Sequence, residues 1–352
     1  MTEKKGHIKT GDREKGLFLF SGSVLLLFAV LLLSVSAGSA SISPWDTARI
    51  FINRLFNTGE LSGIPDTSLV IILKVRLPRV VLAGLVGSSL ALAGGAMQGL
   101  LKNPLADGST LGITSGGALG AVLSLVIGLR PFFLPELGPV LLSILFSFMS
   151  LLLILGLARR LDKGLSTNTI ILTGVIFSMF AGSITSFLIA FSGEDLKQVV
   201  FWTMGSLSGR GWNHVVLLMP LWAFGCFIIL LFSRELNAFS MGEEQARYIG
   251  VNTARVKLLL LITVSVLTGV SVAVSGTIGF VGLVVPHVSR MLGGPDHKRL
   301  LPLSMILGAV FLMGADLISR VLLSPVELPI GIVTSFTGSL FFAYLFYRKR
   351  AR

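Results

Sequence analysis

Uncharged hydrophobic segments follow one another along almost the whole chain, and the charged residues are concentrated in the gaps between them. The chain is 53% hydrophobic and only 13% charged, whereas a soluble domain typically carries about 25% charged residues. Many segments approach or exceed the ~20 residues that a helix needs to cross the hydrocarbon core. Because lipid offers backbone groups no hydrogen bonds, such segments must be helices. The sequence therefore predicts an all-α polytopic membrane protein.

The hydrophobic segments divide the chain into ten predicted transmembrane spans. We expect one ten-span domain (17–347) between a polar, basic N-terminal tail (1–16) and a basic C-terminal tail (348–352). The first segment is longer than a usual signal-peptide core, so we interpret it as an uncleaved span. The eighth is short and contains Pro286. The predicted spans are residues 17–37, 80–100, 111–128, 139–157, 169–191, 215–232, 258–275, 280–292, 301–319 and 331–346.

The basic residues indicate how the spans are oriented. With ten spans and the N-terminus inside, 20 of the 29 lysines and arginines fall in cytoplasmic tails and loops. This bias agrees with the positive-inside rule and predicts that both termini are cytoplasmic. The net charge of +12 then reflects these loops. We therefore expect membrane lipid, and no nucleic acid, among the partners.

Two segments five spans apart resemble each other. Residues 85–94 in the second span and 267–276 in the seventh share Leu, Gly, Ser, Ala and Gly at a constant offset. The two spans must run in opposite directions, and inverted repeats are a common construction of transporters. Chance similarity is the alternative, because small residues recur wherever transmembrane helices pack closely. The glycines of the second span either line a path or only permit close packing, and we favour packing.

The spans carry very little charge that could perform chemistry. Asp316 is the clearest intramembrane charge, and Arg320 one helical turn later favours an i,i+4 ion pair over a proton relay. His287 lacks the second histidine and the carboxylate of a zinc peptidase. The chain also lacks the Gly-x4-Gly-Lys-Ser/Thr pattern that cradles ATP phosphates. We expect no enzyme and no metal site, and any ATP must be bound by another polypeptide.

The predicted cytoplasmic loop at about 234–257 contains signals for a short helix. Ser240 and Glu243 form a capping-box pattern, and Glu243 with Glu244 places two acids in the first turn. Gly250 supplies a residue that ends helices in the left-handed conformation. We expect a helix over 241–249, which binds either a protein partner or, as the alternative, lipid headgroups. The acidic residues favour a protein partner.

Four sequence blocks together resemble the permease subunits of binding-protein-dependent ABC importers for iron–siderophores, haem and vitamin B12, the FecCD family. They are Val-Arg-Leu-Pro-Arg (75–79), Met-Gln-Gly to Asn-Pro-Leu-Ala (97–106), Gly-Phe-Val-Gly-Leu-Val-Val-Pro-His (279–287) and Glu-Leu-Pro-Ile-Gly (327–331). The resemblance implies an inverted-repeat permease of the vitamin B12 importer type in a bacterial cell membrane. It also implies a second permease copy or paralogue, two ATPase subunits that bind ATP and magnesium, and an extracytoplasmic binding protein.

The resemblance also implies roles for particular residues. Small polar residues following Leu165 resemble an inner gate, although Ser and Thr also simply cap helices. Three arginines would pair with acidic residues of the binding protein. Anchoring at the membrane interface or local pairing is the alternative, above all for Arg320 with Asp316. The implied residues are Met241, Gly242, Glu243, Glu244, Ala246, Arg247 and Gly250 for ATPase coupling; Arg76, Arg79 and Arg320 for docking; and Ser166, Thr167 and Asn168 for the gate.

The resemblance favours import of a ferric-siderophore-type chelate, with vitamin B12 and haem as alternatives within the same machinery. An ion-coupled secondary transporter is an alternative from another class, and the shortage of intramembrane charge counts against it. A membrane enzyme or scaffold is a third. The sequence itself does not identify the chelate. It is equally compatible with a homodimer and with a heterodimer of permeases.

Overall fold

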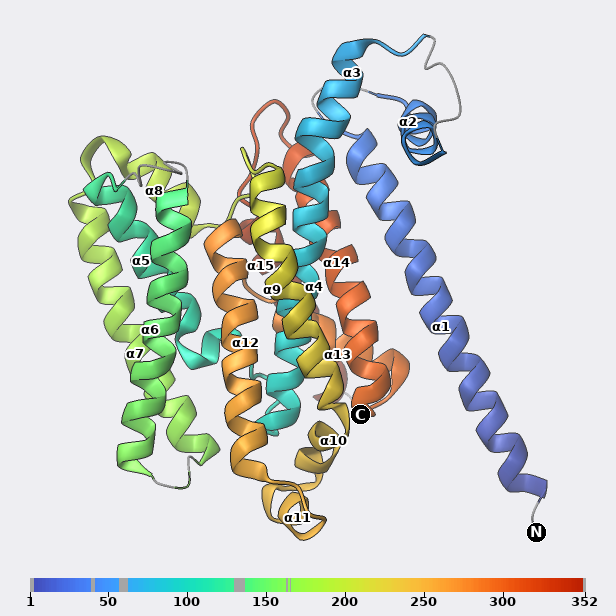
Figure 1. Ribbon diagram of the computed structural model, residues 1–352, viewed down its shortest axis with the longest axis vertical. Helices are drawn as coiled ribbons and strands as arrows, with labels where there is room; N and C mark the ends of the chain where they lie inside the picture. Colours follow the sequence, from blue (N-terminus) through green and yellow to red (C-terminus); the bar gives the residue numbers. More distant parts are fainter. Residues whose placement is uncertain are drawn as a thin grey trace.

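The computed structural model describes residues 3–38, 42–56, 63–129, 137–162, 164 and 166–350, and within these ranges the regular structure is helical throughout. Figure 1 shows the helices as a bundle whose longest axis is vertical. The longer helices are α1 (Glu3–Ser36), α2 (Pro44–Phe56), α4 (Leu77–Leu100), α5 (Ile113–Ile127), α6 (Gly138–Leu161), α7 (Thr167–Ala190), α9 (Trp212–Leu231), α12 (Thr253–Ser275), α13 (Val281–Gly293), α14 (His297–Val321) and α15 (Ile330–Arg350). The shorter ones are α3 (Asp66–Val70), the π-helix η1 (Ile71–Arg76), the 3₁₀ helices η2 (Gly108–Leu111) and η4 (Gly193–Asp195), α8 (Leu196–Thr203), α10 (Ser233–Met241) and α11 (Glu243–Tyr248).

The ten predicted spans correspond one to one with α1, α4, α5, α6, α7, α9, α12, α13, α14 and α15. Six of them (α1, α6, α7, α9, α12 and α14) are long and apolar enough, by length and composition, to cross a membrane. The polytopic all-α prediction is therefore confirmed. Two boundaries differ from the expectation. Residues 3–16 continue the first helix, and the second span is preceded by α3 and η1, so that its helical run begins at Asp66.

Helix α4 lies at the centre of the bundle and is buried along almost its whole length. The small residues of α4 allow it to occupy this central position, because they let the backbones of neighbouring helices approach closely. A Cβ atom at Gly87 would overlap the backbone carbonyl of Gly308 in α14, and one at Gly94 would overlap the carbonyl of Gly282 in α13. The packing interpretation of these glycines is confirmed.

The repeated segments lie on neighbouring helices that run in opposite directions. Residues 85–94 belong to α4, which descends in Figure 1, and residues 267–276 lie in and directly after α12, which ascends beside it. Both segments are buried. This arrangement is the one that the inverted-repeat interpretation requires.

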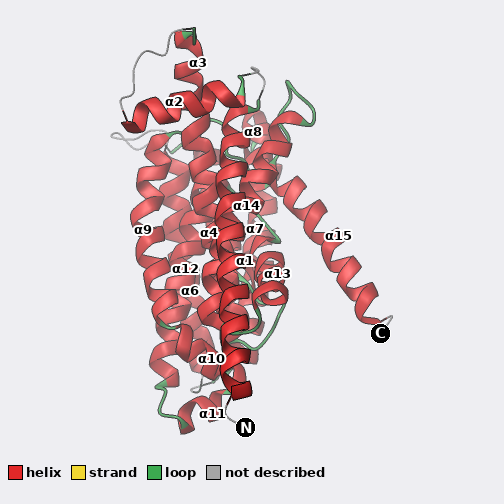
Figure 2. Cartoon of the chain, turned by 90° about the vertical axis from the view of Figure 1, so that its right-hand side faces the viewer, coloured by secondary structure: helices red, strands yellow, loops and turns green. Residues whose placement is uncertain are grey.

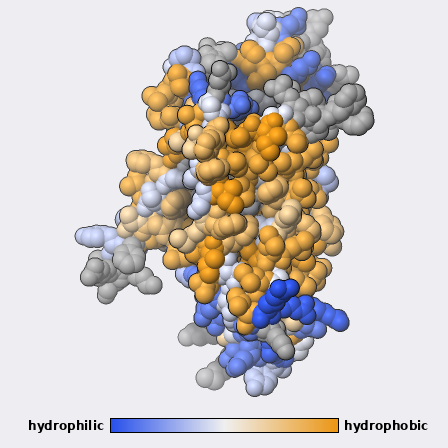
Figure 3. All heavy atoms as spheres, turned by 90° about the vertical axis from the view of Figure 1, so that its left-hand side faces the viewer, coloured by the Kyte–Doolittle hydropathy of each residue, from blue (hydrophilic) through white to orange (hydrophobic). Residues whose placement is uncertain are grey.

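The outside of the bundle is apolar. Figure 3 shows a broad hydrophobic band between more hydrophilic upper and lower ends. Helix α15 leans away from the other helices in Figure 2 and leaves Phe336, Leu340 and Tyr344 exposed. Its apolar face is therefore available to lipid or to another chain.

The segment between α4 and α5 turns back into the bundle instead of staying at its lower end. Asp107 caps the single turn of η2, and Gly112, at φ 68°, then reverses the chain into α5. A non-glycine residue is disfavoured there because positive φ brings Cβ close to the backbone. This re-entrant segment places Asp107 beside the cavity described below.

Candidate functional site

A cavity of about 410 Å³ lies where the first half of the chain meets the second. Its walls come from α4, α5, α12, the re-entrant segment, the end of α8, the segment before α13 with the start of that helix, and the start of α15. Hydroxyl groups of Ser109, Thr114, Thr268 and Ser335 alternate there with small and apolar residues. Among the described residues that line the cavity, Asp107 alone carries a charge. The cavity is thus neutral apart from one carboxylate.

The carboxylate of Asp107 is held by its own loop. Its Oδ1 atom accepts hydrogen bonds from Ser109 N (2.9 Å), Ser109 Oγ (2.5 Å) and Thr110 N (3.2 Å). The sequence interpretation did not select this residue, although it directly follows the Asn-Pro-Leu-Ala block. An acidic residue directly after that block could have marked Asp107 as a candidate. The re-entrant path of the chain, however, produces no periodic pattern in the sequence.

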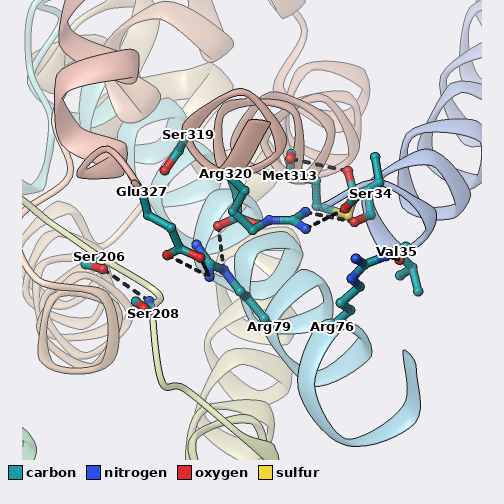
Figure 4. A network of polar contacts seen from close by, with 12 residues as sticks. Ser34, Val35, Arg76, Arg79, Ser206, Ser208, Met313, Ser319, Arg320 and Glu327 are labelled. Carbon is teal, nitrogen blue, oxygen red and sulfur yellow. Dashed lines mark hydrogen bonds and ion pairs between the residues drawn. The ribbon is translucent and has the colours of Figure 1, made fainter. Parts of the chain in front are cut away.

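A buried ion network joins α4, α14 and the segment before α15 at the upper end of the bundle (Figure 4). Asp316 in α14 is fully buried and accepts hydrogen bonds from Arg79 Nε and Arg320 Nε, each at 2.9 Å. Arg79 Nη1 also donates to both carboxylate oxygens of Glu327, at 2.9 and 3.0 Å. Charge-assisted bonds of this kind are stronger than neutral ones. The network therefore fastens α4, α14 and the segment before α15 to one another.

Arg320 of this network and Arg76, the last residue of η1, also bind the end of α1. Arg320 donates to the carbonyls of Ser34 and Ala37, both at 2.8 Å, and Arg76 donates to the carbonyls of Val35 (3.2 Å) and Ser36 (2.5 Å). The last carbonyls of a helix have no partner within the helix and carry partial negative charge. The guanidinium groups satisfy these carbonyls and tie α1 to α4 and α14.

The three arginines predicted for docking are therefore buried and engaged within the chain. Arg76, Arg79 and Arg320 are 5%, 8% and 7% exposed. The expected i,i+4 pair of Arg320 with Asp316 is present, so local pairing, the alternative interpretation, describes this structure. The side chain of Glu327 is more accessible, at 38%. Burial opposes its ionisation, but the hydrogen bonds and charge of Arg79 outweigh burial and lower its pKa. Docking by the arginines stays a prediction.

The lower-end loop forms two short helices, not the single helix expected over 241–249. Gly242, at φ 138°, separates α10 from α11. The capping-box prediction is wrong, because Ser240 lies inside α10 and donates to the carbonyl of Leu236 (3.0 Å). The predicted helix end is confirmed, because Gly250 has φ 90° and Val251 N bonds to the carbonyl of Ala246 (3.0 Å). The loop thus has a defined, bent shape.

The predicted coupling residues divide into anchoring and exposed groups. Glu243 binds the buried amine of Lys257 (2.7 Å), which fixes α11 to the start of α12. Arg247 binds Thr253 Oγ1 (2.9 Å) and Glu243 (3.4 Å). Ala246 is buried beneath them. The exposed side chains include Met241, Glu244, Tyr248 and Ile249, and Arg247 is exposed as well as bonded. Tyr248 is 88% exposed, so a large aromatic group projects from the lower end.

Helix α10 is tied to the start of α14. Asn237 donates to Asp296 Oδ1 (2.7 Å) and accepts from the backbone N–H of His297 (2.8 Å). The ring Nδ1 of His297 lies 2.8 Å from the same Asn237 oxygen. Helix α14 in turn packs closely on α4, so α10 is connected through α14 to the central helix of the bundle.

The predicted gate residues begin α7. Ser166 is the N-cap, with its Oγ accepting from Thr169 N at 3.5 Å, and Thr167 and Asn168 follow in the first turn. Asp162 accepts from the amides of Gly164 (2.8 Å) and Ser166 (2.9 Å). Hydrogen bonds from Ser166 and Gly164 lower the pKa of Asp162 to about 2. The alternative interpretation as caps therefore agrees with the structure. None of the three gate residues is among those lining the cavity, Leu165 lies outside the described residues, and the gate stays a prediction.

The described residues form a cavity with polar contacts above and below it. Within them, no three His, Cys, Asp or Glu side chains gather where they could hold a metal ion. The site consists of one carboxylate and several hydroxyls around a cavity, with an ion network above it and a bent loop below it.

A solved structure resembles the chain over almost its whole length. It is described as an ABC transporter of the metal-chelate type in an inward-facing conformation. The TM-score is 0.81 at 33% sequence identity, and the match covers 94% of this chain and 98% of the other.

Curated relatives cover nearly the same length. The uncharacterized ABC transporter permease protein YvrB of Bacillus subtilis (strain 168) is 45% identical over 91% of this chain and 90% of its own. The cobalamin import system permease protein BtuC of Halobacterium salinarum is 38% identical, over 82% and 77%. The hemin transport system permease protein HmuU of Yersinia pestis is also 38% identical, over 94% and 96%.

The family model named FecCD transport family matches residues 25–348, which include nine of the ten spans completely and most of the first. The match contains the cavity, the ion network and the bent loop. On this evidence the chain is a member of the FecCD transport family.

Proposed function

We propose that this chain is the membrane permease subunit of an ABC importer that brings a metal chelate of the ferric-siderophore type into the cell. The observation that carries the proposal is the cavity between the two halves of a FecCD-family bundle. The names of the relatives include cobalamin, hemin and iron chelatin transport, so vitamin B12 and haem are the alternative cargoes. ATP and magnesium bind to a separate subunit.

The lower end in Figure 1 is cytoplasmic in this proposal. It carries α11 and the N-terminus, and the basic residues Arg247, Arg255 and Lys257 lie there. The positive-inside rule supports this orientation. The C-terminal helix then also ends on the cytoplasmic side, and the ion network with Glu327 faces the outside.

An ATPase subunit docks against the bent loop. The exposed Tyr248 and Ile249 fit a hydrophobic groove of a partner, and the exposed Glu244 adds specificity through charge. The anchors behind this face explain how a movement reaches the bundle. Glu243 passes it to α12 through Lys257, and Asn237 passes it to α14 through His297. Closure of the ATPase pair then tilts these helices as rigid bodies.

A second permease copy or a paralogue covers the apolar face of α15. Phe336, Leu340 and Tyr344 are spaced four residues apart, form one stripe and are each more than half exposed. The cavity is lined partly by the first turns of this helix, so a partner packed here closes a shared pathway. Two ATPase subunits beneath a pair of permeases complete the assembly.

The binding protein docks at the outer end. A carboxylate of the binding protein reaches Arg79 only by displacing Glu327, whereas a cationic side chain meets Glu327 directly. Docking through the arginines therefore requires the network to exchange partners, and Arg320 would have to release Asp316 or the end of α1. This exchange gives the binding protein a means of changing the packing of α1, α4 and α14.

Reconstitution with the partner subunits tests the proposal. We expect proteoliposomes containing the permease, its ATPase subunits and its binding protein to accumulate a ferric siderophore when ATP is supplied, and cobalamin or hemin less. An ATPase that binds ATP but cannot hydrolyse it should abolish accumulation. No ATP-dependent accumulation of any of the three cargoes would contradict the proposal.

Coupling can be tested separately from insertion. Tyr248→Ser should reduce binding-protein-stimulated ATP hydrolysis at least tenfold, because it removes an exposed aromatic anchor. Trp45→Ser, at another highly exposed aromatic residue on α2, is the matched control and should retain stimulation. Equal stimulation of ATP hydrolysis in both variants would contradict the role of the loop in coupling.

A further inference from the structure

The one charged group among the described residues that line the cavity, the carboxylate of Asp107, is hydrogen-bonded through only one of its two oxygens. Three donors occupy Oδ1 of Asp107, whereas the described residues provide no hydrogen bond to Oδ2. Asp107 is 8% exposed and lines the cavity. A buried carboxylate is costly unless it is paired or fully hydrogen-bonded. The open oxygen therefore favours a cation or a hydrogen-bond donor in the cavity.

A second polar group points to the same place. Thr268 in α12 is 2% exposed and lines the cavity, and its Oγ1 atom has no hydrogen-bond partner. The hydroxyl lies directly against residue 108, because a Cβ added at Gly108 would overlap it. Other buried hydroxyls of the described residues also lack a partner, but among them Thr268 is the one that lines this cavity, where a ligand or water can satisfy it. Thr268 and Asp107 come from opposite halves of the chain, and Thr268 lies against the residue that follows Asp107.

Helix capping accounts for Oδ1 but not for the charge. Asp107 caps η2, and asparagine is an equally good cap residue. Capping alone therefore gives no reason to place a carboxylate in the cavity wall. The backbone around it also holds the group in place, since a Cβ at Gly282 would lie 3.3 Å from the Cβ of Asp107.

We propose that Asp107 and Thr268 form a subsite for a cationic or hydrogen-bond-donating group of the cargo, such as a primary ammonium or an amide N–H. The inference rests on the proposed transport function and narrows its substrate class. The permease accepts neutral or cationic chelates that present such a group and disfavours polyanionic ones. A carboxylate in a poorly solvated cavity repels anions strongly. The cavity of about 410 Å³ takes one projecting part of a large chelate.

Charge-selective thiol reagents measure the potential in the cavity without a cargo. Ser335→Cys places a thiol in its wall, in a background where Cys226 is replaced by Ala, within the complete complex with the ATPase subunits. A trimethylammonium methanethiosulfonate should react faster than its sulfonate analogue, with a rate ratio roughly tenfold above that of a free thiol. Asp107→Asn, which keeps the cap, should return the ratio to the free-thiol value.

The control thiol lies outside the cavity. Thr67→Cys on the exposed helix α3 should show the same reagent ratio with Asp107 and with Asn at that position. A ratio at Ser335→Cys that is unchanged by Asp107→Asn would overturn the inference.

A matched pair of chelates then tests the ligand class. Ferrioxamine B carries a free ammonium group, and its N-acetyl derivative does not. Ferrioxamine B should slow labelling of Ser335→Cys at least tenfold more effectively, and both Asp107→Asn and Thr268→Val should reduce this difference. Equal protection by the two chelates, or none by either, would overturn the inference. If sodium chloride alone slowed labelling of Ser335→Cys as much as ferrioxamine B does, the subsite would be assigned to a free inorganic cation instead of cargo.

Failure of this inference is distinguishable from failure of the proposed function. The same preparation is assayed for ATP-dependent uptake with its binding protein. Uptake that requires ATP but is indifferent to cargo charge and to Asp107→Asn would leave the transport function standing and refute the subsite. Absence of ATP-dependent uptake would refute the function, and with it the assignment of the subsite to cargo.

Discussion

Replacing Asp316 with alanine should destabilise the permease more than any other single change in the ion network. Asp316 is fully buried and accepts one 2.9 Å hydrogen bond from each of two guanidinium groups. Its removal leaves Arg79 and Arg320 buried beside a small cavity with their shared counterion gone. Removing one partner of a buried ion pair costs about 3–5 kcal/mol, because an uncompensated charge remains.

The remaining contacts place the expected loss at the lower end of that range. Arg79 retains Glu327, and Arg320 retains the carbonyls of Ser34 and Ala37. We therefore expect Asp316→Ala to lower the free energy of unfolding by about 3 kcal/mol, roughly a hundredfold in the folded-to-unfolded ratio. The double variant Asp316→Leu/Arg320→Met should lose about 1–2 kcal/mol less than Asp316→Ala, since it removes one of the unpaired charges and fills the space.

Equilibrium unfolding in mixed micelles, followed by circular dichroism as sodium dodecyl sulfate is added, measures these differences. Asp66→Ala is the matched control, because Asp66 is an exposed acid at the same end of the bundle. It should change stability by no more than about 0.5 kcal/mol. A loss below about 1 kcal/mol for Asp316→Ala, or a double variant less stable than the single one, would refute the structural role of the network.

Three further predictions follow from local geometry. Gly94→Ala should cost about 1–3 kcal/mol in the same unfolding assay, since its Cβ overlaps the Gly282 carbonyl, whereas Gly182→Ala, with open space around it, should be neutral or slightly stabilising. The Asp162 pKa of about 2 lies below the unfolded value of about 3.9, so its stabilising contribution is full above pH 4 and is lost as pH falls through 2. The difference in thermal midpoint between wild type and Asp162→Asn should therefore shrink from pH 5 to pH 2, and a constant difference would contradict this. Gly242→Ala should weaken binding-protein-stimulated ATP hydrolysis, because a φ of 138° strains any residue with a Cβ, and unchanged stimulation would contradict the need for the bend.

The spans were predictable because length and hydropathy determine them locally. The predicted spans 80–100 and 280–292 lie within a few residues of α4 and α13. What the sequence could not indicate was the continuation of helices beyond the membrane-length segment. Residues 3–16 and the π-helix η1 carry charged or mixed sequences that are equally compatible with loops, and their helical form is set by the helix that they extend.

The polar sites depend on contacts between distant parts of the chain. The spacing of Asp316 and Arg320 predicts their pair, because i,i+4 residues face each other on a helix. Nothing local indicates that Arg79, 237 positions away, shares the same carboxylate. Likewise, Asp107 reads as an ordinary loop residue until the loop is seen to turn back into the bundle.

The lower-end loop shows how a motif can mislead. Ser-x-x-Glu predicts a helix start, but Ser240 is already helical and Gly242 provides the actual break. The pattern records side-chain chemistry at fixed spacing and does not record the backbone conformation that must accompany it. The end of the same helix was predictable, because glycine adopts positive φ more readily than any other residue and commonly ends helices in that conformation.

Import into sealed vesicles, with and without the nucleotide-hydrolysing partner, tests the central claim most directly. The permease, its binding protein and the cargo chelate are reconstituted under an imposed proton or sodium gradient, and accumulation is measured with the ATPase subunits present or omitted. We predict accumulation only when the ATPase subunits and ATP are both present, whatever the ion gradient. Gradient-driven accumulation by the chain without the ATPase would identify a secondary transporter and contradict the account.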